Sequence, residues 1–400
     1  MAMMEIVVDD ICLEMEDCVF AQFCYEHFDA DKDGKVSSLD ASTVEIMNVQ
    51  GLGITSLKGI EFFTNLTFLN CSNNQLRTLD TSQLFNLSEL ECSHNPLEHL
   101  SVQNNTKLLS LNCEGCNLYY LDLSHNLNLT KLNCASSPIY ESQGRCWSFF
   151  GNEPFYNSIR SLDLSKNTEL VELDCSWNPL GKLDVSHNIR LKKLDCRETH
   201  LSRLDIRKNT KLTHLDCARN NLQKLDLSKN HNLKILYCSF NFLKCLNLRK
   251  NTKLTLLDCS CNQLSRLYIR NNSSLTRLFC SGNLLKRLDT RFNTKLTILI
   301  CGGDTYNDLF CIEPGFSNQN SIESLDLRNN TQLTDLNCSC NPIVCLDVSN
   351  NRKLKSLVYE SDFLEDLLPY NTEHLKVLYF RKGQRIKKCI YPDDCIIEYC

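Results

Sequence analysis

A pattern of apolar and polar positions repeats with a fixed period of 21 through most of the chain. Its first half reads L-x-x-L-x-C-x-x-N, as in LVELDCSWN, and its second half reads L-x-x-L-D-L-S-x-N, as in IRSLDLSKN. In both halves the apolar residues that follow the first leucine alternate with polar ones. A period of two predicts a short strand whose alternate side chains face inward. We therefore expect two short strands in each repeat, and the first of them points Leu and Cys inward.

Cysteines mark this period along the chain. Twelve of the 25 cysteines occupy the same slot and follow one another at a constant interval of 21, except for one interval of 41 and one of 37. These intervals equal 21 plus 20 and 21 plus 16, so they indicate insertions at about 136–157 and 302–320. Fixed-period self-similarity predicts a solenoid of about fifteen coils. The cysteines of the ladder are Cys71, Cys92, Cys113, Cys134, Cys175, Cys196, Cys217, Cys238, Cys259, Cys280, Cys301 and Cys338.

Asparagine recurs three residues after the cysteine slot and three residues after the last aliphatic position of the second half. Turns inside a stacked repeat hide backbone N–H and C=O groups from water, and such groups need partners. The sequence therefore predicts that stacked asparagine side chains hydrogen-bond the backbone of each turn.

The repeat LxxLxCxxNxLxxLDLSxN resembles the cysteine-ladder leucine-rich repeats of the internalin-J type, which occur in bacterial surface and secreted proteins. The resemblance covers residues from about 46 to 390. It implies a β-rich repeat solenoid, curved and parallel, with the Leu-x-Cys strands on the concave face. It also implies a binding or adhesion role without catalysis, and it identifies no partner.

The ladder cysteines are expected to be packing residues. A buried thiol behaves as a small hydrophobe. Neighbouring strands lie ~4.8 Å apart, which leaves stacked Cβ atoms slightly too distant for a relaxed disulfide. No C-x-x-C pair is followed by a second one at zinc-finger spacing, so a structural zinc site is disfavoured.

An open solenoid exposes its core at both ends and needs caps. Residues 1–45 are expected to form a helical cap, because MEDCVFAQFCYEHF places apolar residues at helical spacing. The solenoid then spans 46–356. The last coils and a β-structured cap take 357–400, where Tyr359 and Phe380 replace the ladder cysteine.

The stretch DADKDGKVSSLD follows the predicted helix and resembles an EF-hand or dockerin loop. Calcium requires several oxygen ligands at fixed spacing on a tightly turned loop. At the last position an aspartate replaces the usual glutamate. The alternative is a capping box in which Ser37 and Asp40 start the next helix. The expected ligands of one Ca²⁺ are Asp29, Asp31, Asp33, the Lys35 carbonyl, Ser37 and Asp40.

Outward positions of the Leu-x-Cys strands are polar in early and middle coils and apolar in four consecutive later coils. Stacked coils place these apolar residues on one face, and an exposed apolar patch with aromatic residues marks an interface. This predicts a contact surface for a protein or glycan partner. The alternative is that the second insertion folds over it. The residues are Ile235, Tyr237, Leu256, Phe279, Ile298 and Ile300.

The second halves of the coils carry a row of basic residues with aspartates between them. Solvated ion-pair ladders account for such a row, and so does a site for an anionic ligand such as an acidic glycan. The row comprises Lys182, Arg203, Arg207, Lys224, Arg249, Arg266, Arg270, Arg287, Arg291 and Arg328.

Composition and motifs narrow the function classes. A net charge of −5 gives no bulk attraction to nucleic acid, and no apolar run approaches the ~20 residues needed to span a bilayer. The first residues lack a basic and an apolar signal region. We expect a surface or secreted protein if a leader was removed, and otherwise a cytoplasmic one.

Phosphate-binding, zinc-protease and nucleophile-elbow motifs are absent from the sequence. We therefore predict no catalytic residues and a non-enzymatic recognition module. An intracellular bacterial interaction scaffold is the alternative, and a hydrolase is the least favoured interpretation.

Overall fold

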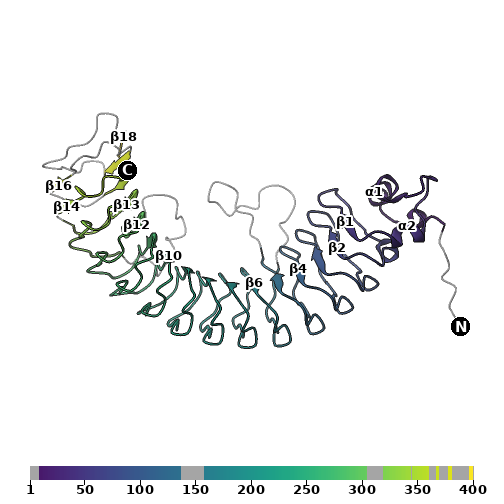
Figure 1. Cartoon of the computed structure of the whole chain (residues 1–400), viewed down its shortest axis with the longest axis horizontal. Helices are drawn as coiled ribbons and strands as arrows, with labels where there is room; N and C mark the ends of the chain where they lie inside the picture. Colours follow the sequence, from purple (N-terminus) through teal and green to yellow (C-terminus); the bar gives the residue numbers. More distant parts are fainter. Residues whose placement is uncertain are drawn as a thin grey trace. The chain divides into compact units, whose positions relative to one another are not determined.

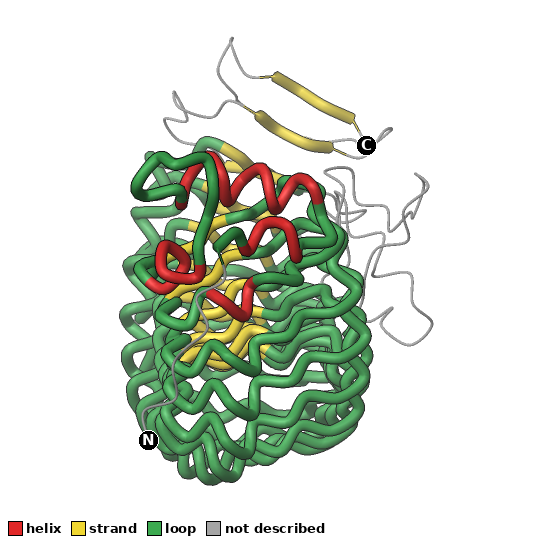
Figure 2. Tube along the Cα trace, turned by 90° about the vertical axis from the view of Figure 1, so that its right-hand side faces the viewer, coloured by secondary structure: helices red, strands yellow, loops and turns green. Residues whose placement is uncertain are grey.

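The computed structural model describes residues 9–136, 157–303, 319–343 and 345–359, together with the backbone of the strands at 366–368, 377–380 and 396–399. The chain divides into two compact units, Met1–Thr199 and His200–Cys400. Each unit consists of stacked coils in which a short strand is followed by a return segment (Figure 1). Within each unit the strands of successive coils lie side by side (Figure 2).

In the first unit the strands pair in parallel and in chain order. Each residue of a strand is in register with its equivalent in the next coil, as Leu69 is with Leu90. The strands are β1 (Ile46–Asn48), β2 (Phe68–Asn70), β3 (Glu89–Glu91), β4 (Ser110–Asn112), β5 (Lys131–Asn133), β6 (Glu172–Asp174) and β7 (Lys193–Asp195).

The second unit continues the same parallel arrangement, so the predicted β-solenoid is confirmed in both units. Its main sheet contains β8 (His214–Asp216), β9 (Ile235–Tyr237), β10 (Leu256–Asp258), β11 (Arg277–Phe279), β12 (Ile298–Ile300), β13 (Asp335–Asn337), β15 (Ser356–Val358), β17 (Val377–Phe380) and β18 (Ile396–Tyr399). A separate pair is formed by β14 (Cys345–Asp347) and β16 (Asp366–Leu368).

Helices precede the first strand, as the sequence predicts for an N-terminal cap (Figure 1). They are η1 (Ile11–Glu14), α1 (Cys18–Phe28) and α2 (Ser38–Ser42), and a further turn, η2 (Ile60–Phe62), follows β1. Asp17 begins α1 by accepting the N–H groups of Val19 and Phe20. Its second oxygen accepts the N–H and hydroxyl of Thr55, both at 2.7 Å, which fixes the cap to the first coil. Among the described residues, no helix combines the length and apolar character needed to cross a bilayer.

All twelve ladder cysteines are fully buried, which confirms that they pack the interior of the coils. The leucines of the strands are buried beside them, as Leu69 and Leu90 are. Tyr359 takes the slot near the end of the solenoid, is also fully buried, and donates its hydroxyl to the Ile343 carbonyl at 2.7 Å. The side chain of Phe380 lies outside the described part of the chain.

Buried asparagines join each coil to its neighbour, as predicted. Asn95 donates its amide to the carbonyls of Cys71 and Cys92, at 2.9 and 3.0 Å, and accepts the N–H of Leu76 at 3.1 Å. In the return segments, Asn126 donates in the same way to the carbonyls of Val102 and Asn105. Each side chain therefore satisfies backbone groups that the stacked turns hide from water.

Both insertions leave the coil at the same point, between the ladder cysteine and the ladder asparagine. Asn157 follows Cys134 by 23 residues and donates to its carbonyl at 3.1 Å. Asn320 follows Cys301 by 19 residues and donates to its carbonyl at 3.0 Å. The usual spacing is three, so the whole of each insertion is confined to this turn. Residues 137–156 and 304–318 of the insertions lie outside the described residues.

The second predicted strand of each coil is absent from nearly all the described coils. In the return segments we find only β14, β16 and one isolated bridge, between Asp80 and Ser101. In these segments the aspartate of L-x-x-L-D-L-S accepts the N–H two residues later, as Asp122 does from Ser124 at 2.9 Å. The same turn follows Asn70 and Asp174 at the ends of β2 and β6, so the alternation of apolar and polar residues does not decide which half of a coil pairs as a strand.

Candidate interaction surfaces

The outward side chains of the strands form one surface, which we call the strand face. In the second unit it consists of two columns set by the parallel register. One column runs Ile235, Leu256, Arg277, Ile298, and the other runs Tyr237, Asp258, Phe279, Ile300. The structure thus brings the six predicted partner-binding residues together in adjacent columns on four strands.

The side chains of this patch are more buried than those of the exposed apolar patch that the sequence predicts. Leu256 is 7% exposed, because it stands between Ile235 and Arg277 in the column, and the other five predicted residues are half-buried. Arg277 and Asp258 interrupt the two columns. The proposed alternative cover, the second insertion, falls on residues 304–318, outside the described residues.

The strand face of the first unit carries Ile46 and Phe68 on β1 and β2 and is polar from β3 to β7. Asn112 donates to Glu91 at 2.7 Å, and Asn133 donates to Glu114 at 2.9 Å. Further along, Asp174 is in register with Asp195, which pairs with Arg197. Burial and the neighbouring Asp195 carboxylate raise the pKa of Asp174 to about 6.

Asp174→Asn is expected to stabilise the protein at pH 7.5 by about 1–2 kcal/mol, because the folded state then no longer holds a buried anion. The raised pKa means that the folded state binds more protons than the unfolded state between about pH 4 and 6. Wild-type stability therefore falls as pH rises through this window, and the advantage of the variant fades near pH 4. Urea unfolding at pH 4.5 and 7.5 measures both effects.

Asparagine is already used at this position elsewhere, since Asn70 accepts the N–H and hydroxyl of Ser72 as Asp174 does from Ser176. The substitution therefore keeps the local turn. Equal stability of the two proteins at pH 7.5 would contradict the raised pKa.

Three of the predicted calcium ligands lie together. Carboxylate oxygens of Asp29, Asp31 and Asp33 are within 4.8 Å of one another in the loop after α1. Ser37 and Asp40 form the alternative structure, a capping box, in which Asp40 accepts the Ser37 N–H at 2.9 Å and hydroxyl at 2.6 Å. The Lys35 side chain turns to Asp9 at 2.5 Å.

Outward side chains of the return segments form a second surface, the return face. Here the predicted ion-pair ladders are present in three coils, where Arg207, Arg291 and Arg328 pair with the aspartate two residues earlier at 2.6, 2.9 and 2.8 Å. The guanidinium of Arg207 lowers the pKa of Asp205 to about 2. Arg249, Arg266, Arg270 and Arg287, of the same predicted row, have no such pair among the described residues.

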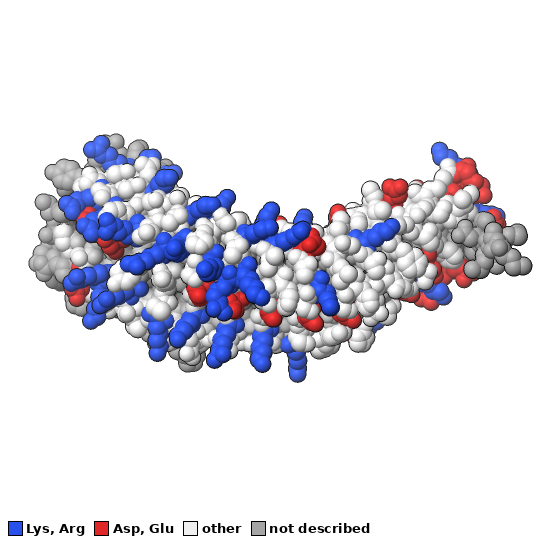
Figure 3. All heavy atoms as spheres, turned by 60° about the horizontal axis from the view of Figure 1, so that its bottom comes forward, with Lys and Arg blue, Asp and Glu red and all other residues white. Residues whose placement is uncertain are grey.

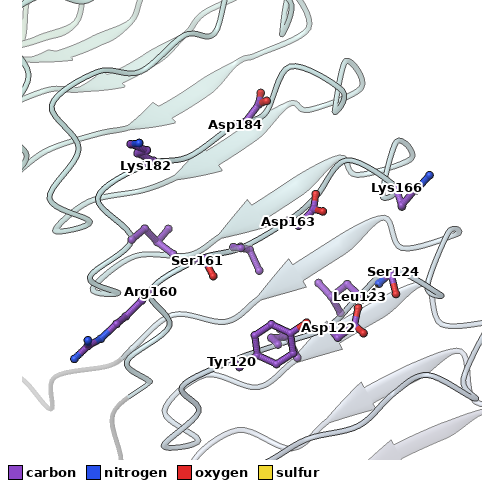
Figure 4. Close-up of a pocket in the computed structure, with 13 residues that line it drawn as sticks. Tyr120, Asp122, Leu123, Ser124, Arg160, Ser161, Asp163, Lys166, Lys182 and Asp184 are labelled. Carbon is purple, nitrogen blue, oxygen red and sulfur yellow. Dashed lines mark hydrogen bonds between the residues drawn. The ribbon is translucent and has the colours of Figure 1, made fainter.

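A cleft of about 690 Å³ opens on the return face of the first unit (Figure 4). Asp122, Asp163 and Asp184 reach it from three successive coils, and Tyr120 and Arg160 lie at its edge. Hydrogen bonds from Ser124 and Ser165 lower the pKa of Asp122 and Asp163, so these carboxylates serve the turns. The sequence did not predict this cleft. Its only indication is the insertion at 136–157, which lies in the sequence between the coil of Asp122 and the coil of Asp163.

Comparison with solved structures agrees with the ladder and the fold. The functional domain of InlJ from Listeria monocytogenes, which includes a cysteine ladder, superposes with a TM-score of 0.78 and 33% identity, over 94% of this chain and 76% of that one. The chain belongs to the internalin-J-type family of cysteine-ladder leucine-rich repeat proteins. No protein-family model and no curated protein matches it.

Two further structures share the fold of this family. The internalin InlF of Listeria monocytogenes has a TM-score of 0.65 and 19% identity, over 93% of this chain and 97% of that one. A leucine-rich repeat protein of Leptospira interrogans has a TM-score of 0.69 and 18% identity, over 90% and 97%. Membership in the family supports an interaction module.

Proposed function

We propose that this protein is a non-enzymatic recognition module that binds a protein or glycan partner through the strand face of its second unit. The observation that carries the proposal is the difference in character between equivalent positions of the two units. These positions are Ser110 and Asn112 on β4 of the first unit and Ile298 and Ile300 on β12 of the second. Strands β9–β12 hold the apolar side chains on a rigid sheet, which favours a preorganised contact surface.

Half-burial of these side chains also fits a contact surface. Aromatic and aliphatic residues that keep part of their area in water can release it when a partner docks. Tyr237 and Phe279 stand in the same column on either side of Asp258, and aromatic residues are enriched at the centres of interfaces.

Ile298→Asp with Ile300→Asp is expected to reduce partner binding by roughly a hundredfold, because two buried carboxylates would have to lose their hydration on docking. The labelled full chain, wild type and variant, is compared on a glycan array and on a panel of purified extracellular receptor domains. Ser110→Asp with Asn112→Asp, which introduces the same two charges at the equivalent positions of the first unit, is the matched control.

Thermal unfolding of the double variant separates loss of binding from loss of structure. A folded variant that binds every partner as the wild type does would overturn the proposed surface. Collapse of the fold would show instead that Ile298 and Ile300 belong to the core.

The internalin-like neighbours support a bacterial surface or secreted location, and we propose this location for the protein. The alternative is an intracellular interaction scaffold. Fractionation of the native organism with an antibody against the chain distinguishes the two, since a cytoplasmic pool alone would exclude the proposed location.

We further propose that the loop at Asp29, Asp31 and Asp33 binds one Ca²⁺ through its carboxylates. The support is the convergence of three hard oxygen donors on one turned loop. Asp40 can join them only with an oxygen that the capping box does not use, since its Oδ2 accepts from Ser37. The residues present therefore fit a weak site.

Millimolar Ca²⁺ is expected to raise the melting temperature of chelated protein by a few degrees, because the ion binds only the folded loop. Calorimetric titration measures the affinity. Asp31→Asn should abolish the heat and the shift, whereas Asp122→Asn, on the return face of the first unit, should leave both unchanged. Absence of heat and shift in the wild type would exclude the site.

A further inference from the structure

A long stretch of the second unit is strongly basic although the chain as a whole is acidic. Residues 227–288 contain eleven Lys and Arg and a single acidic residue, Asp258. All eleven basic side chains are exposed, and Asp258 belongs to β10 on the strand face. Figure 3 brings the lower side of Figure 1 forward and shows Lys and Arg outnumbering Asp and Glu over its left half.

The excess arises because the aspartate column of the return face is interrupted in two consecutive coils. Asp205, Asp226, Asp289 and Asp326 hold this position in other coils of the unit, but Asn247 and Tyr268 replace it between them. Asn247 still accepts the N–H of Arg249, at 3.2 Å, so the turn is kept while the charge is lost.

Guanidinium groups surround the interruption. Arg266 and Arg270 flank Tyr268 on the outward side, since Leu267 and Ile269 between them are buried. Arg266 lies 3.4 Å from the Tyr268 hydroxyl, and the Arg270 guanidinium is 4.6 Å from the centre of the Phe292 ring. Arg249 and Arg287 come from the coils on either side.

None of these four arginines has a carboxylate within ion-pair distance in the described part of the chain. This contrasts with Arg207, Arg291 and Arg328 on the same face. Arginine binds sulfate and carboxylate groups with two parallel hydrogen bonds. One or two such groups on each of several consecutive coils suit a ligand whose anionic groups repeat along a chain.

We propose that the return face around Tyr268 binds an acidic polysaccharide, with sulfate or carboxylate groups at the arginines and a sugar ring against the tyrosine. Tyr268 is 65% exposed, and its ring offers an apolar face next to the cations. A single-stranded nucleic acid would stack successive bases on several aromatic side chains. The patch offers Tyr268 and the less exposed Phe292, whose ring already packs against the Arg270 guanidinium, so Tyr268 is its main stacking surface. The site is separate from the strand face and does not depend on the function proposed for it.

Tyr268→Asp tests the proposal with a residue that the repeat itself uses at this position, so the fold is expected to be kept. The probe is a fluorescein-labelled heparin decasaccharide, and its anisotropy is measured with the full chain at low and moderate salt. The new carboxylate should pair with Arg266 and Arg270 and weaken binding by roughly tenfold, with a shallower salt dependence. Neutral dextran should not bind.

Two further variants make the result specific to the patch. Ser101→Asp adds the same charge at the equivalent position of the first unit, next to no arginine of the row, and should leave binding unchanged. Asp205→Asn with Asp226→Asn removes two more carboxylates from the aspartate column. The new amides can still accept the turn N–H, as Asn247 does. This variant should bind the decasaccharide roughly threefold more tightly or better.

The proposal is overturned if the wild type does not bind the decasaccharide, or if Tyr268→Asp and Ser101→Asp weaken it equally. It is also overturned if a single-stranded oligonucleotide of equal charge binds as tightly and responds to Tyr268→Asp in the same way, because the ligand class would then be nucleic acid.

Discussion

Asn241→Ala is expected to lower the free energy of unfolding by about 3–5 kcal/mol, although the residue carries no charge and touches no partner. Its buried amide donates to the carbonyls of Cys217 and Cys238, at 3.0 and 3.3 Å, and its oxygen accepts the N–H of Leu222 at 3.0 Å. Alanine leaves at least one donor and one carbonyl buried without partners, and each costs about 1–3 kcal/mol.

Urea unfolding of the full chain measures the loss, and hydrogen exchange at the Leu222 amide locates it. Repeat arrays need not unfold in one step, so the exchange rate of this amide is the sharper measurement. Asn271→Ala is the matched control, because Asn271 is exposed one residue before the ladder asparagine of its turn. We expect a change within about 0.5 kcal/mol there. Similar losses in both variants would show that the ladder does not stabilise the stack.

The chain itself contains a milder form of this substitution. Thr199 occupies a ladder asparagine position and donates its hydroxyl to the Cys196 carbonyl at 2.5 Å. A hydroxyl supplies one donor where the amide supplies two, so Asn241→Thr should fall between the wild type and Asn241→Ala.

The stacking of the coils could be predicted from the sequence because it depends on period and side-chain type alone. Outside the two insertions, a step of one period aligns each ladder cysteine with the next, and the structure buries all twelve. The same kind of pattern gave a wrong prediction of secondary structure for the return segments. Alternation predicted strands there, but Asp122 and its equivalents close turns on the N–H two residues later. Asp174 at the end of β6 makes the same turn with Ser176, so neither the apolar pattern nor the turn shows which half of a coil pairs as a strand.

Asn157 and Asn320 show a second limit of sequence reasoning. Both complete the asparagine ladder, yet they stand 23 and 19 residues after their cysteines. A search at fixed spacing cannot find a residue that returns to the stack after an insertion of arbitrary length. They are assigned to the ladder by their hydrogen bonds to the backbone carbonyls of Cys134 and Cys301.

The candidate surfaces were partly predictable, because the repeat period determines which side chains are neighbours across the strands. The register that aligns Ile298 with Arg277 follows from the period, so the apolar columns could be assembled from the sequence. The sequence does show that Asn247 and Tyr268 stand two residues before Arg249 and Arg270. It does not show that an arginine of this row pairs with the residue two positions earlier, as Arg207 does with Asp205. The burial of Leu256 likewise depends on how neighbouring side chains lie across the strands.

Alkaline pH is expected to unfold the solenoid between about pH 9 and 10.5 through its buried thiols. Burial raises the pKa of Cys301 to about 12, and it raises the pKa of Cys71 and Cys238 further. A raised pKa in the folded state means that the unfolded chain releases its thiol protons first, near pH 9. Stability is therefore complete below pH 9 and falls as pH rises, by about 1.4 kcal/mol per pH unit for each ladder cysteine that is exposed on unfolding.

Thermal unfolding from pH 7 to 10 measures this slope, and the time course of the reaction with Ellman's reagent at pH 8 separates fast-reacting thiols from protected ones. Cys18, Cys245 and Cys345 are exposed and should react at once. Ladder thiols should react at least about a thousandfold more slowly, since a pKa near 12 instead of 9 lowers the thiolate fraction by that factor and burial adds to it.

Replacing three consecutive rungs, Cys238→Ala, Cys259→Ala and Cys280→Ala, separates the titration from the packing. Each small cavity costs about 1–2 kcal/mol at pH 7, but the variant has three fewer thiols to ionise. Its stability should therefore fall less steeply above pH 9 than that of the wild type, and the two curves should converge. Cys245→Ser changes an exposed thiol and should leave the curve unchanged. Parallel curves for the wild type and the triple variant would mean that the ladder thiols do not govern alkaline unfolding.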